Sequence, residues 1–321
     1  MVDESIVKCN ECGTKNRIND NSPKNKKIIC GKCSKPLSPS LERQKILNKI
    51  KEELKRVRNY TPKVGIFGDT GVGKSSLCNA LFGKDIAKIS NVEACTRKPQ
   101  EILIGDSDGK GIILVDVPGV GEDRQRNNEY FKLYKSLSKE LDLIIWAIKA
   151  DDRKYMTAID AYQEILLPNL KNCPVIFVIT QVDKIEPYRE WNRKENLPSP
   201  KQLENIVRKT DDIASRFSVD KNTIIPISAN DSYNLVKLVN KIVEVLPNEK
   251  KYSFTRETKK EIVSDEASEN AEKGIWTHVK EMAGTAWDYI KDEVLDEAVK
   301  IILKVVPKPV VVVLKWLGII S

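Results

Sequence analysis

Lys63-Val-Gly-Ile-Phe-Gly-Asp-Thr-Gly-Val-Gly-Lys-Ser-Ser-Leu-Cys-Asn-Ala-Leu-Phe-Gly83 is the stretch that decides the fold. Its apolar run from Val64 to Phe67 predicts a buried strand, and the spacing from Ser75 to Phe82 predicts a helix that ends at Gly83. Between them, four residues separate two glycines, and a Lys-Ser pair follows, which is the phosphate-loop pattern. Glycines let successive backbone N–H groups turn inward, and the helix start adds its positive dipole end. The stretch therefore predicts a loop that binds a nucleoside triphosphate.

The residues of this loop have separate expected roles. Lys74 is expected to reach the β- and γ-phosphates, and Ser75 to ligate magnesium through its hydroxyl. A chance glycine loop before a helix is the disfavoured alternative, because strand and helix both lie where the pattern needs them. The expected nucleotide contacts in the loop are Asp69, Thr70, Gly71, Val72, Gly73, Lys74, Ser75 and Ser76.

Composition narrows the class of protein. The chain has 321 residues, of which 40% are hydrophobic and 31% charged, as in globular proteins with a charged surface. This length holds one medium domain with smaller pieces at each end. No apolar stretch follows Met1, which predicts no signal peptide and a cytoplasmic location. Four lysines interrupt the only strongly apolar region, so no spanning helix is expected; they are Lys300, Lys304, Lys308 and Lys315.

The positive charge is concentrated near the beginning of the chain. Residues 1–60 contain 15 Lys and Arg against 7 Asp and Glu, a surplus of 8. The whole chain has 54 against 46, also a surplus of 8, so residues 61–321 are balanced. A basic module beside a neutral domain indicates an anionic partner, most often a nucleic acid. A solvated lysine-rich surface is the alternative.

Two Cys-x-x-Cys pairs lie in the same basic part. Cys9 and Cys12 are followed, after 17 residues, by Cys30 and Cys33. This spacing predicts a structural zinc site with four thiolate ligands. Redox pairs and disulfides are the alternatives, and a cytoplasmic location disfavours disulfides. The stretch resembles zinc ribbons, and residues 1–37 have so few apolar side chains that they are expected to need the metal to fold.

Residues 38–60 follow as a linker and an amphipathic helix. The helix is expected at 41–59, with an apolar stripe that packs on the next domain or, as the less favoured alternative, on a partner.

Polar residues follow the strands predicted after the phosphate loop. Thr96 lies in an irregular stretch where a nucleotide switch needs a hydroxyl, although an ordinary loop threonine is the alternative. Residues 99–104 and 111–115 predict a hairpin. Asp116 closes its second strand and could hold magnesium through water, while the Gly119 N–H could sense the γ-phosphate.

The nucleotide base is expected at the ends of two later strands. Asp183, after a strand at 175–179, can accept bonds from guanine N1–H and the exocyclic amine, a pair that adenine does not offer. Helices are expected near 156–170, 201–217 and 235–246, and further strands at 141–148 and 223–227. The remaining expected base contacts are Thr180, Gln181, Lys184, Ser228, Ala229 and Asn230.

Strands that alternate with helices, with a motif at each strand's carboxyl end, predict a doubly wound α/β fold. In their order, the motifs resemble the five G motifs of small GTPases over about residues 62–248. Within that superfamily they are most similar to the Era/TrmE/septin branch, notably the bacterial large-ribosomal-subunit-binding GTPases, through Ala94-Cys-Thr-Arg97, Asp116-Val-Pro-Gly119 and Lys149-Ala-Asp-Asp-Arg153. There is some similarity to the immunity-related GTPases.

The resemblance implies a GTPase domain at 61–248 that hydrolyses GTP with magnesium, followed by a helical extension at 249–321. Lys74, Thr96 and Gly119 would then lie at the catalytic centre, with Ser75, Thr96 and Asp116 around the magnesium ion.

Two positions depart from the family pattern. Thr180-Gln181 replaces the usual Asn-Lys, and the shorter glutamine stem is expected to weaken guanine binding unless Lys184 substitutes for the lysine. Val120 stands where many switch GTPases have a catalytic glutamine, and Gly71 where potassium-activated relatives have an asparagine. Slow turnover is therefore expected, with a group supplied from elsewhere, including across a homodimer through the nucleotide face. Candidates, each with an ordinary surface charge as the alternative, are Arg97, Arg124, Arg126, Asp152 and Arg153.

The C-terminal part has a different character. Apolar spacing from Ile275 to Val294 predicts a long amphipathic helix. Residues 298–321 have no acid and place four lysines on one side of a helix that Pro307 and Pro309 break. Packing on the rest of the chain is favoured over a peripheral membrane contact. Three functions stay open: a GTPase switch, a nucleotide-gated membrane or assembly scaffold, and a GTP-regulated tether to the ribosome or RNA through the basic zinc ribbon.

Overall fold

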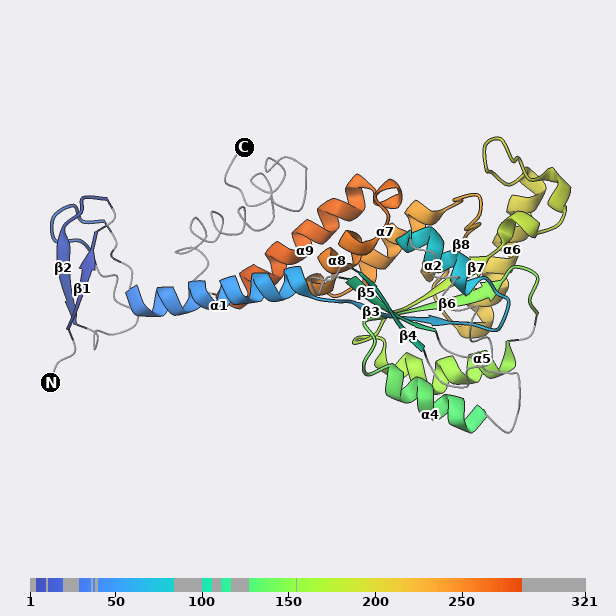
Figure 1. Cartoon of the computed structure of the whole chain (residues 1–321), viewed down its shortest axis with the longest axis horizontal. Coiled ribbons are helices and arrows are strands. Elements are labelled where there is room, and N and C mark those ends of the chain that lie inside the picture. Colours follow the sequence, from blue (N-terminus) through green and yellow to red (C-terminus); the bar gives the residue numbers. More distant parts are fainter. Residues whose placement is uncertain are drawn as a thin grey trace. The chain divides into compact units, whose positions relative to one another are not determined.

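The computed structural model describes residues 4–9, 11–19, 29–35, 37, 40–83, 100–105, 111–116, 127–153 and 155–284 (Figure 1). The chain divides into two compact units, residues 1–56 with 276–321, and residues 57–275. Several predictions fall outside the described residues. These are the ones on Thr96, Arg97, Gly119, Val120, Arg124, Arg126 and residues 298–321.

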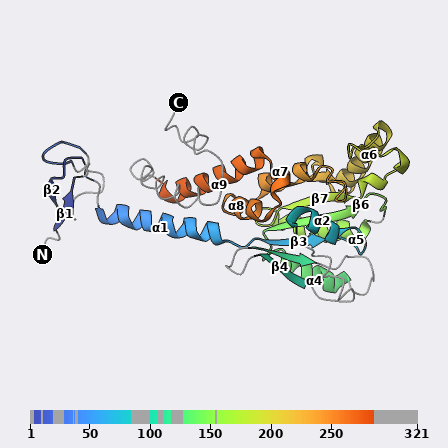
Figure 2. The same ribbon diagram turned by 45° about the horizontal axis from the view of Figure 1, so that its top comes forward.

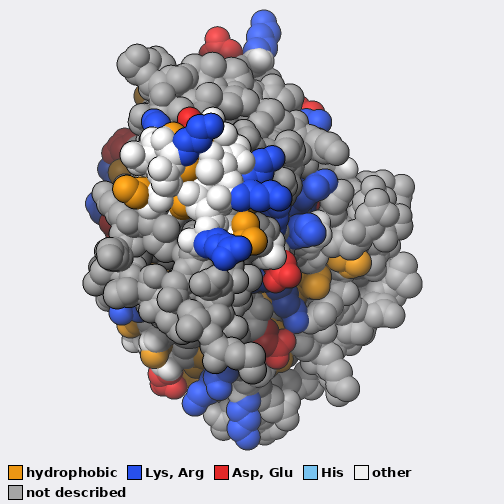
Figure 3. Space-filling model, turned by 90° about the vertical axis from the view of Figure 1, so that its left-hand side faces the viewer, with side chains coloured by type: hydrophobic (Ala, Val, Ile, Leu, Met, Phe, Trp, Pro, Cys, Tyr) orange, Lys and Arg blue, Asp and Glu red, His pale blue; other side chains and the backbone are white. Residues whose placement is uncertain are grey.

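The first unit contains a small two-stranded ribbon and parts of two helices. Strands β1 (Glu4–Lys8) and β2 (Lys15–Asn19) pair antiparallel. Helix α1 (Ser40–Asn59) begins in this unit, and helix α9 (Asp265–Ala283) ends in it. His278 of α9 is hydrogen-bonded to Glu53 of α1 at 2.8 Å. Lys and Arg side chains gather with exposed hydrophobic ones on the described part of the face drawn in Figure 3.

The second unit is built on a six-stranded sheet in the order β4-β5-β3-β6-β7-β8. Five strands are parallel, and only β4 runs antiparallel to its neighbour β5. The doubly wound α/β class expected from the sequence is confirmed, as is the hairpin after the phosphate loop. The strands are β3 (Lys63–Phe67), β4 (Gln100–Gly105), β5 (Gly111–Asp116), β6 (Leu143–Lys149), β7 (Val175–Thr180) and β8 (Ile224–Pro226).

Helices cover both faces of this sheet (Figures 1 and 2). Side chains of each strand alternate between the two faces, and apolar side chains on both faces need helices to bury them. In β6, Leu143 and Ile145 join one buried cluster, while Ile144 and Trp146 join the other. The first cluster lies under helices α2 (Lys74–Phe82), α7 (Leu235–Val245), α8 (Asn248–Glu257) and the start of α9. The second lies under α4 (Asn127–Leu137), α5 (Met156–Ala161) and α6 (Pro200–Phe217).

The helix expected near 156–170 is not one regular α-helix. After α5 the chain forms a π-helical turn at Tyr162–Leu166 and a 3-10 turn at Leu167–Asn169. Pro168 lies in the last turn, and its missing N–H removes an α-helical donor at this point. Aromatic packing nonetheless fixes the segment, since the Tyr162 ring lies 5.2 Å from that of Phe177 in β7.

A buried carboxylate just before β6 contacts residues near the start of β3 and a lysine of α8. Asp142, which is 3% exposed, accepts hydrogen bonds from the Tyr60 hydroxyl and the Lys63 N–H, both at 2.8 Å. Lys250 of α8 places its ammonium 2.6 Å from the same carboxylate. Residues 249–275 therefore belong to the same packed body, and Phe254 and Ala271 lie in the first core cluster.

Among the helices that the structure describes, none combines the length and the apolar character that a membrane crossing requires.

Candidate nucleotide site and metal centre

The phosphate loop, residues 68–75, follows the carboxyl end of β3. At β3 the order in which the chain adds strands to the sheet reverses from one side to the other. The next parallel strand, β5, lies on one side of β3, and β6 lies on the other. In doubly wound sheets the ligand crevice forms at such a switch point. The segments after β7 and β8, residues 180–184 and 228–230, reach the same edge because these strands are parallel to β3.

Three glycines give the loop its shape. Gly68, Gly71 and Gly73 have φ angles of 136°, 80° and 93°, a region that side chains rarely adopt. At Gly68 an added Cβ would also lie 2.3 Å from the carbonyl oxygen of Ala147 in β6. At Gly71 an added Cβ would have no described atom within 4 Å, so the described residues leave the middle of the loop open to a phosphate group.

Lys74 and Ser75 open helix α2 directly after these glycines. The Lys74 ammonium donates hydrogen bonds to the carbonyl oxygens of Gly68 at 2.8 Å and Asp69 at 3.2 Å. It therefore lies across the loop, on the side where phosphate oxygens would replace the carbonyls. Ser75 is half-buried in the first turn. Inward glycines, a lysine and a helix start form a donor set that fits a magnesium nucleotide.

The segment after β7 is hydrogen-bonded to the phosphate loop. The buried Thr180 hydroxyl donates to the Val72 carbonyl at 2.6 Å, so this threonine offers a hydroxyl to the loop. Gln181 has a left-handed backbone, with φ of 58°, and its side-chain amide donates to the Gly71 carbonyl at 3.3 Å. The Lys184 ammonium in turn donates to the Gln181 Oε1 at 2.9 Å. Gln181 thus binds the loop, and Lys184 holds Gln181.

The other expected base contacts lie near these hydrogen bonds between residues 180–181 and the phosphate loop. Asp183 is half-buried in a 3-10 turn, Val182–Lys184, whose first N–H donates to the Ile227 carbonyl at 3.2 Å. This bond joins the end of β7 to the segment of Ser228. Ser228 is buried, and its hydroxyl donates to Asp231 at 3.2 Å. Sequence reasoning missed Asp231, although Ser228, Asn230 and Asp231 are of residue types that favour turns.

A cavity of about 20 Å³ lies beside the phosphate end of the site, lined by Gly68, Asp69, Asp152 and Tyr155 among others. The Tyr155 hydroxyl donates to the Asp152 carbonyl at 2.5 Å, and the ammonium of Lys209, from α6, contacts both groups. Burial lowers the pKa of Lys209 and raises the pKa of Tyr155. Of the two candidate catalytic groups that the structure describes, Asp152 lines this cavity with the phosphate-loop residues Gly68 and Asp69, whereas Arg153 is exposed.

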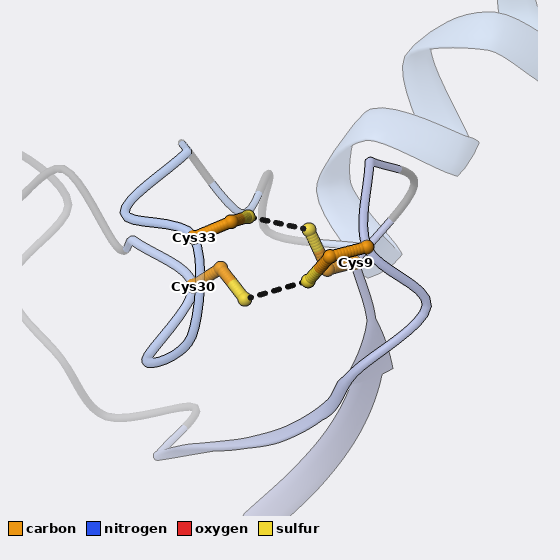
Figure 4. Close-up of side chains that lie close together, drawn as sticks. Cys9, Cys30 and Cys33 are labelled. Atoms are coloured by element: carbon orange, nitrogen blue, oxygen red, sulfur yellow. Dashed lines mark hydrogen bonds between the residues drawn. The ribbon is translucent and has the colours of Figure 1, made fainter.

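The four cysteines of the ribbon form a compact cluster. All four sulfur atoms lie within 4.8 Å of one another, with Cys9 and Cys33 at 3.5 Å and Cys12 and Cys30 at 3.6 Å (Figure 4). A tetrahedral zinc ion with Zn–S bonds of about 2.3 Å places its sulfurs about 3.8 Å apart. The thiols are free rather than joined as disulfides. The donor set and spacing therefore fit a closed, structural zinc site.

The two cysteine pairs lie on matching backbone knuckles. Cys9 N–H donates to the Thr14 carbonyl, and Cys30 N–H donates to that of Lys35, five residues on in each case. The fourth residue after each cysteine, Gly13 or Ser34, has a positive φ and donates back to it.

Groups around the Cys30 sulfur favour its metal-binding form. Backbone N–H groups of Cys33 and Lys32 lower the pKa of the Cys30 thiol to about 6. The Asn16 side chain approaches the Cys30 sulfur at 3.5 Å and accepts from the Gly31 N–H at 2.9 Å. Sequence reasoning missed Asn16, which braces the metal site from β2.

The fold and the ordered motifs define a P-loop GTPase domain. Residues 63–181 match the family described as the 50S ribosome-binding GTPase. The uncharacterized protein YkfA of Escherichia coli (strain K12) is 36% identical over 206 residues, which are 64% of this chain and 69% of YkfA. GTPase Era of Caldicellulosiruptor saccharolyticus is 32% identical over 192 residues, 59% of this chain and 56% of that protein.

Among solved structures, Era in complex with MgGDPNP and nucleotides of 16S ribosomal RNA is 28% identical, with a TM-score of 0.42. The match covers 58% of this chain and 57% of that one. The chain therefore spans little more than half the length of the Era proteins. It belongs to the same family as YkfA, and it carries a GTP-binding P-loop GTPase domain of the Era-like type.

Proposed function

We propose that the protein is a magnesium-dependent GTP switch with slow intrinsic turnover. The observation that carries this proposal is the phosphate loop, which has three left-handed glycines and the Lys74 ammonium across its mouth. The ammonium and the loop N–H groups would bind the β- and γ-phosphates. Ser75, Thr96 and Asp116 would hold magnesium, which neutralises charge on the transferred phosphoryl group when bound.

The base site would select guanine through Asp183. A carboxylate accepts two N–H groups of guanine, and a base without that pair leaves the carboxylate unsatisfied. Thr180, Gln181 and Lys184 would position the phosphate loop against the base, while Ser228, Ala229 and Asn230 would close the base pocket.

Slow turnover follows from the residue at Val120, which offers no polar group to orient water. We propose that two chains pair through the nucleotide face and that a group from the partner completes the site. A trans-acting arginine can raise turnover by about 10³- to 10⁵-fold. Specific activity with saturating GTP should then rise with protein concentration, and a flat profile would contradict the pairing.

The domain limits we propose are a zinc ribbon at 1–37, a linker and helix at 38–60, a GTPase domain at 61–248 and a helical extension at 249–321. Part of that extension packs on the sheet of the GTPase domain. The cysteine cluster would hold a structural zinc ion.

Two partner proposals accompany the switch. The basic residues 1–60 would bind RNA or the ribosome, and residues 298–321 would make a peripheral membrane contact. Vesicle flotation that is unchanged after deletion of residues 298–321 would show that these residues do not make the membrane contact.

Turnover of GTP by the wild-type chain and by Lys74→Ala tests the proposed site. The loss of the ammonium should abolish measurable turnover, since it removes the main positive charge at the phosphates. Lys171→Ala, an exposed lysine of the same unit, is the matched control and should keep wild-type activity. Equal turnover in all three proteins would overturn the assignment of the loop.

A further inference from the structure

The two-stranded zinc ribbon has one face that contacts the cysteine cluster and one that points away from it. Side chains alternate along a strand, so Lys15 and Arg17 of β2 project opposite to Asn16. Asn16 is committed to the metal centre through its contacts with Cys30 and Gly31. Lys15 and Arg17 therefore project away from the cysteine cluster.

The pairing with β1 adds two more residues to this outer face. Ile6 lies directly opposite Arg17, and Lys8 lies directly opposite Lys15. Glu4 and Asn19 form the next alternate pair of the ribbon, and we call the four residues Ile6, Lys8, Lys15 and Arg17 the outer ribbon face. All four are exposed, and Ile6 retains 64% of its accessible surface.

Three cations on so small a face are unfavourable for the ribbon itself. Directly opposed side chains lie about 5 Å apart at Cβ, and like charges at that distance destabilise a strand pair. Among the side chains that the structure describes, none forms an ion pair with Lys8, Lys15 or Arg17. Like charges on directly opposed residues break a local rule of strand pairing, and proteins break such rules at functional sites.

We propose that the outer ribbon face binds the phosphate backbone of a nucleic acid strand. Charge complementarity argues for this occupant, because the entire surplus of 8 positive charges in the chain falls within residues 1–60. The single apolar side chain, Ile6, suits contact with a sugar or base. A membrane interface would instead need a broad apolar face, which four residues do not supply. This inference narrows the RNA partner proposed above and does not depend on GTP turnover.

Salt dependence gives the expected size of the effect. Each phosphate neutralised on a single strand contributes about −0.7 to the slope of log affinity against log salt. Three cations predict a slope of about −2, so affinity should fall about 20-fold between 50 and 200 mM salt. With Lys8 and Lys15 both neutralised, the slope should be about −0.7, and the same salt change should cost only about 3-fold.

The experiment measures binding of a fluorescent oligouridine to the full-length, zinc-loaded chain by anisotropy at several salt concentrations. The test variant is Lys8→Gln/Lys15→Gln. The matched control is Arg193→Gln/Lys194→Gln, which removes the same charge from an exposed turn of the other unit. Zinc content is measured in each protein, because a variant that retains one zinc per chain has kept its ribbon. Ile6→Ala should weaken binding without changing the slope.

A shallower slope and weaker binding in the test variant alone would support the proposal. Equal slopes in the test and control variants, with zinc retained, would overturn it. Polyglutamate that competes as well as unlabelled oligouridine, at equal charge, would also overturn it in favour of an acidic protein partner. GTP turnover should be the same in the test variant and the wild-type chain, so failure of this inference is distinct from failure of the proposed switch.

Discussion

Replacing Thr180 by valine tests whether the segment after β7 holds the phosphate loop. Valine has nearly the same shape as threonine but lacks the hydroxyl that donates to the Val72 carbonyl at 2.6 Å. Thr180 is 3% exposed and Val72 4%, so water cannot easily replace the lost donor. The loop should therefore lose its most buried contact with the base site.

The expected cost follows from this burial. A buried acceptor left without its donor costs about 1–3 kcal/mol. The loop around Gly71 is open and can shift toward solvent, which places the cost at the lower end, about 1–1.5 kcal/mol. The loop conformation that binds GDP would be destabilised by the same free energy, so the dissociation constant for GDP should rise by up to about 10-fold.

Calorimetric titration with GDP, with unfolding in urea as a second measurement, compares the wild type with Thr180→Val and Thr180→Ser. Serine keeps the hydroxyl and loses only a methyl group, so Thr180→Ser should bind GDP nearly as the wild type does. If the valine variant bound GDP with wild-type affinity, or if the serine variant were equally impaired, the hydroxyl would not be what holds the loop.

Three further predictions concern other parts of the molecule. Removal of zinc by a chelator should expose residues 5–37 to protease while residues 57–275 stay resistant, and continued protection of the ribbon would contradict a structural metal. The Glu53 carboxyl should titrate near pH 2 by NMR instead of 4.5, since bonds from Arg56 and His278 lower its pKa. Because its folded pKa is depressed, its contribution to stability is complete above about pH 4.5 and is lost as the pH falls toward 2; Glu53→Gln should remove this acid sensitivity. Asp142→Asn should lower the free energy of unfolding by about 2–4 kcal/mol, because it leaves Lys250 without its charged partner in a largely buried position; a loss below 0.5 kcal/mol in urea melts would show that the network is unimportant.

The parts of the fold that follow from local sequence could be predicted. The β3–loop–α2 unit has an apolar run, glycines at fixed spacing and a helix start within about twenty residues. Each of these features determines the backbone conformation of residues adjacent to it in the sequence. The same holds for the cysteine knuckles, where positive φ falls on Gly13 and Ser34 at equal distances from the first cysteine.

The parts that depend on distant segments could not be predicted. Asp142 looks like an ordinary loop carboxylate in the sequence, yet Tyr60 and Lys250, 82 and 108 positions away, meet it in the core. Lys209 similarly reaches the Asp152 carbonyl from a helix that the sequence shows only as amphipathic. No periodicity or motif encodes such pairings, because they arise when the sheet brings separate elements together.

Gln181 lies between these two cases. Its place in the base motif is visible in the sequence, where it appears only as a poor substitute for lysine. The structure gives it a left-handed backbone and a hydrogen bond to the Gly71 carbonyl, with Lys184 behind it. Whether this arrangement weakens guanine binding stays a prediction.

Calorimetric titration of the purified chain with guanine nucleotides in magnesium tests the central claim most directly. The account predicts that GTP and GDP bind at one site per chain, that ATP does not bind, and that Asp183→Asn loses guanine nucleotides and gains affinity for xanthine nucleotides. The gain follows because the new amide can donate to the carbonyl that xanthine carries in place of the amine of guanine. The absence of heat from both GTP and GDP, or equal binding of ATP, would contradict it.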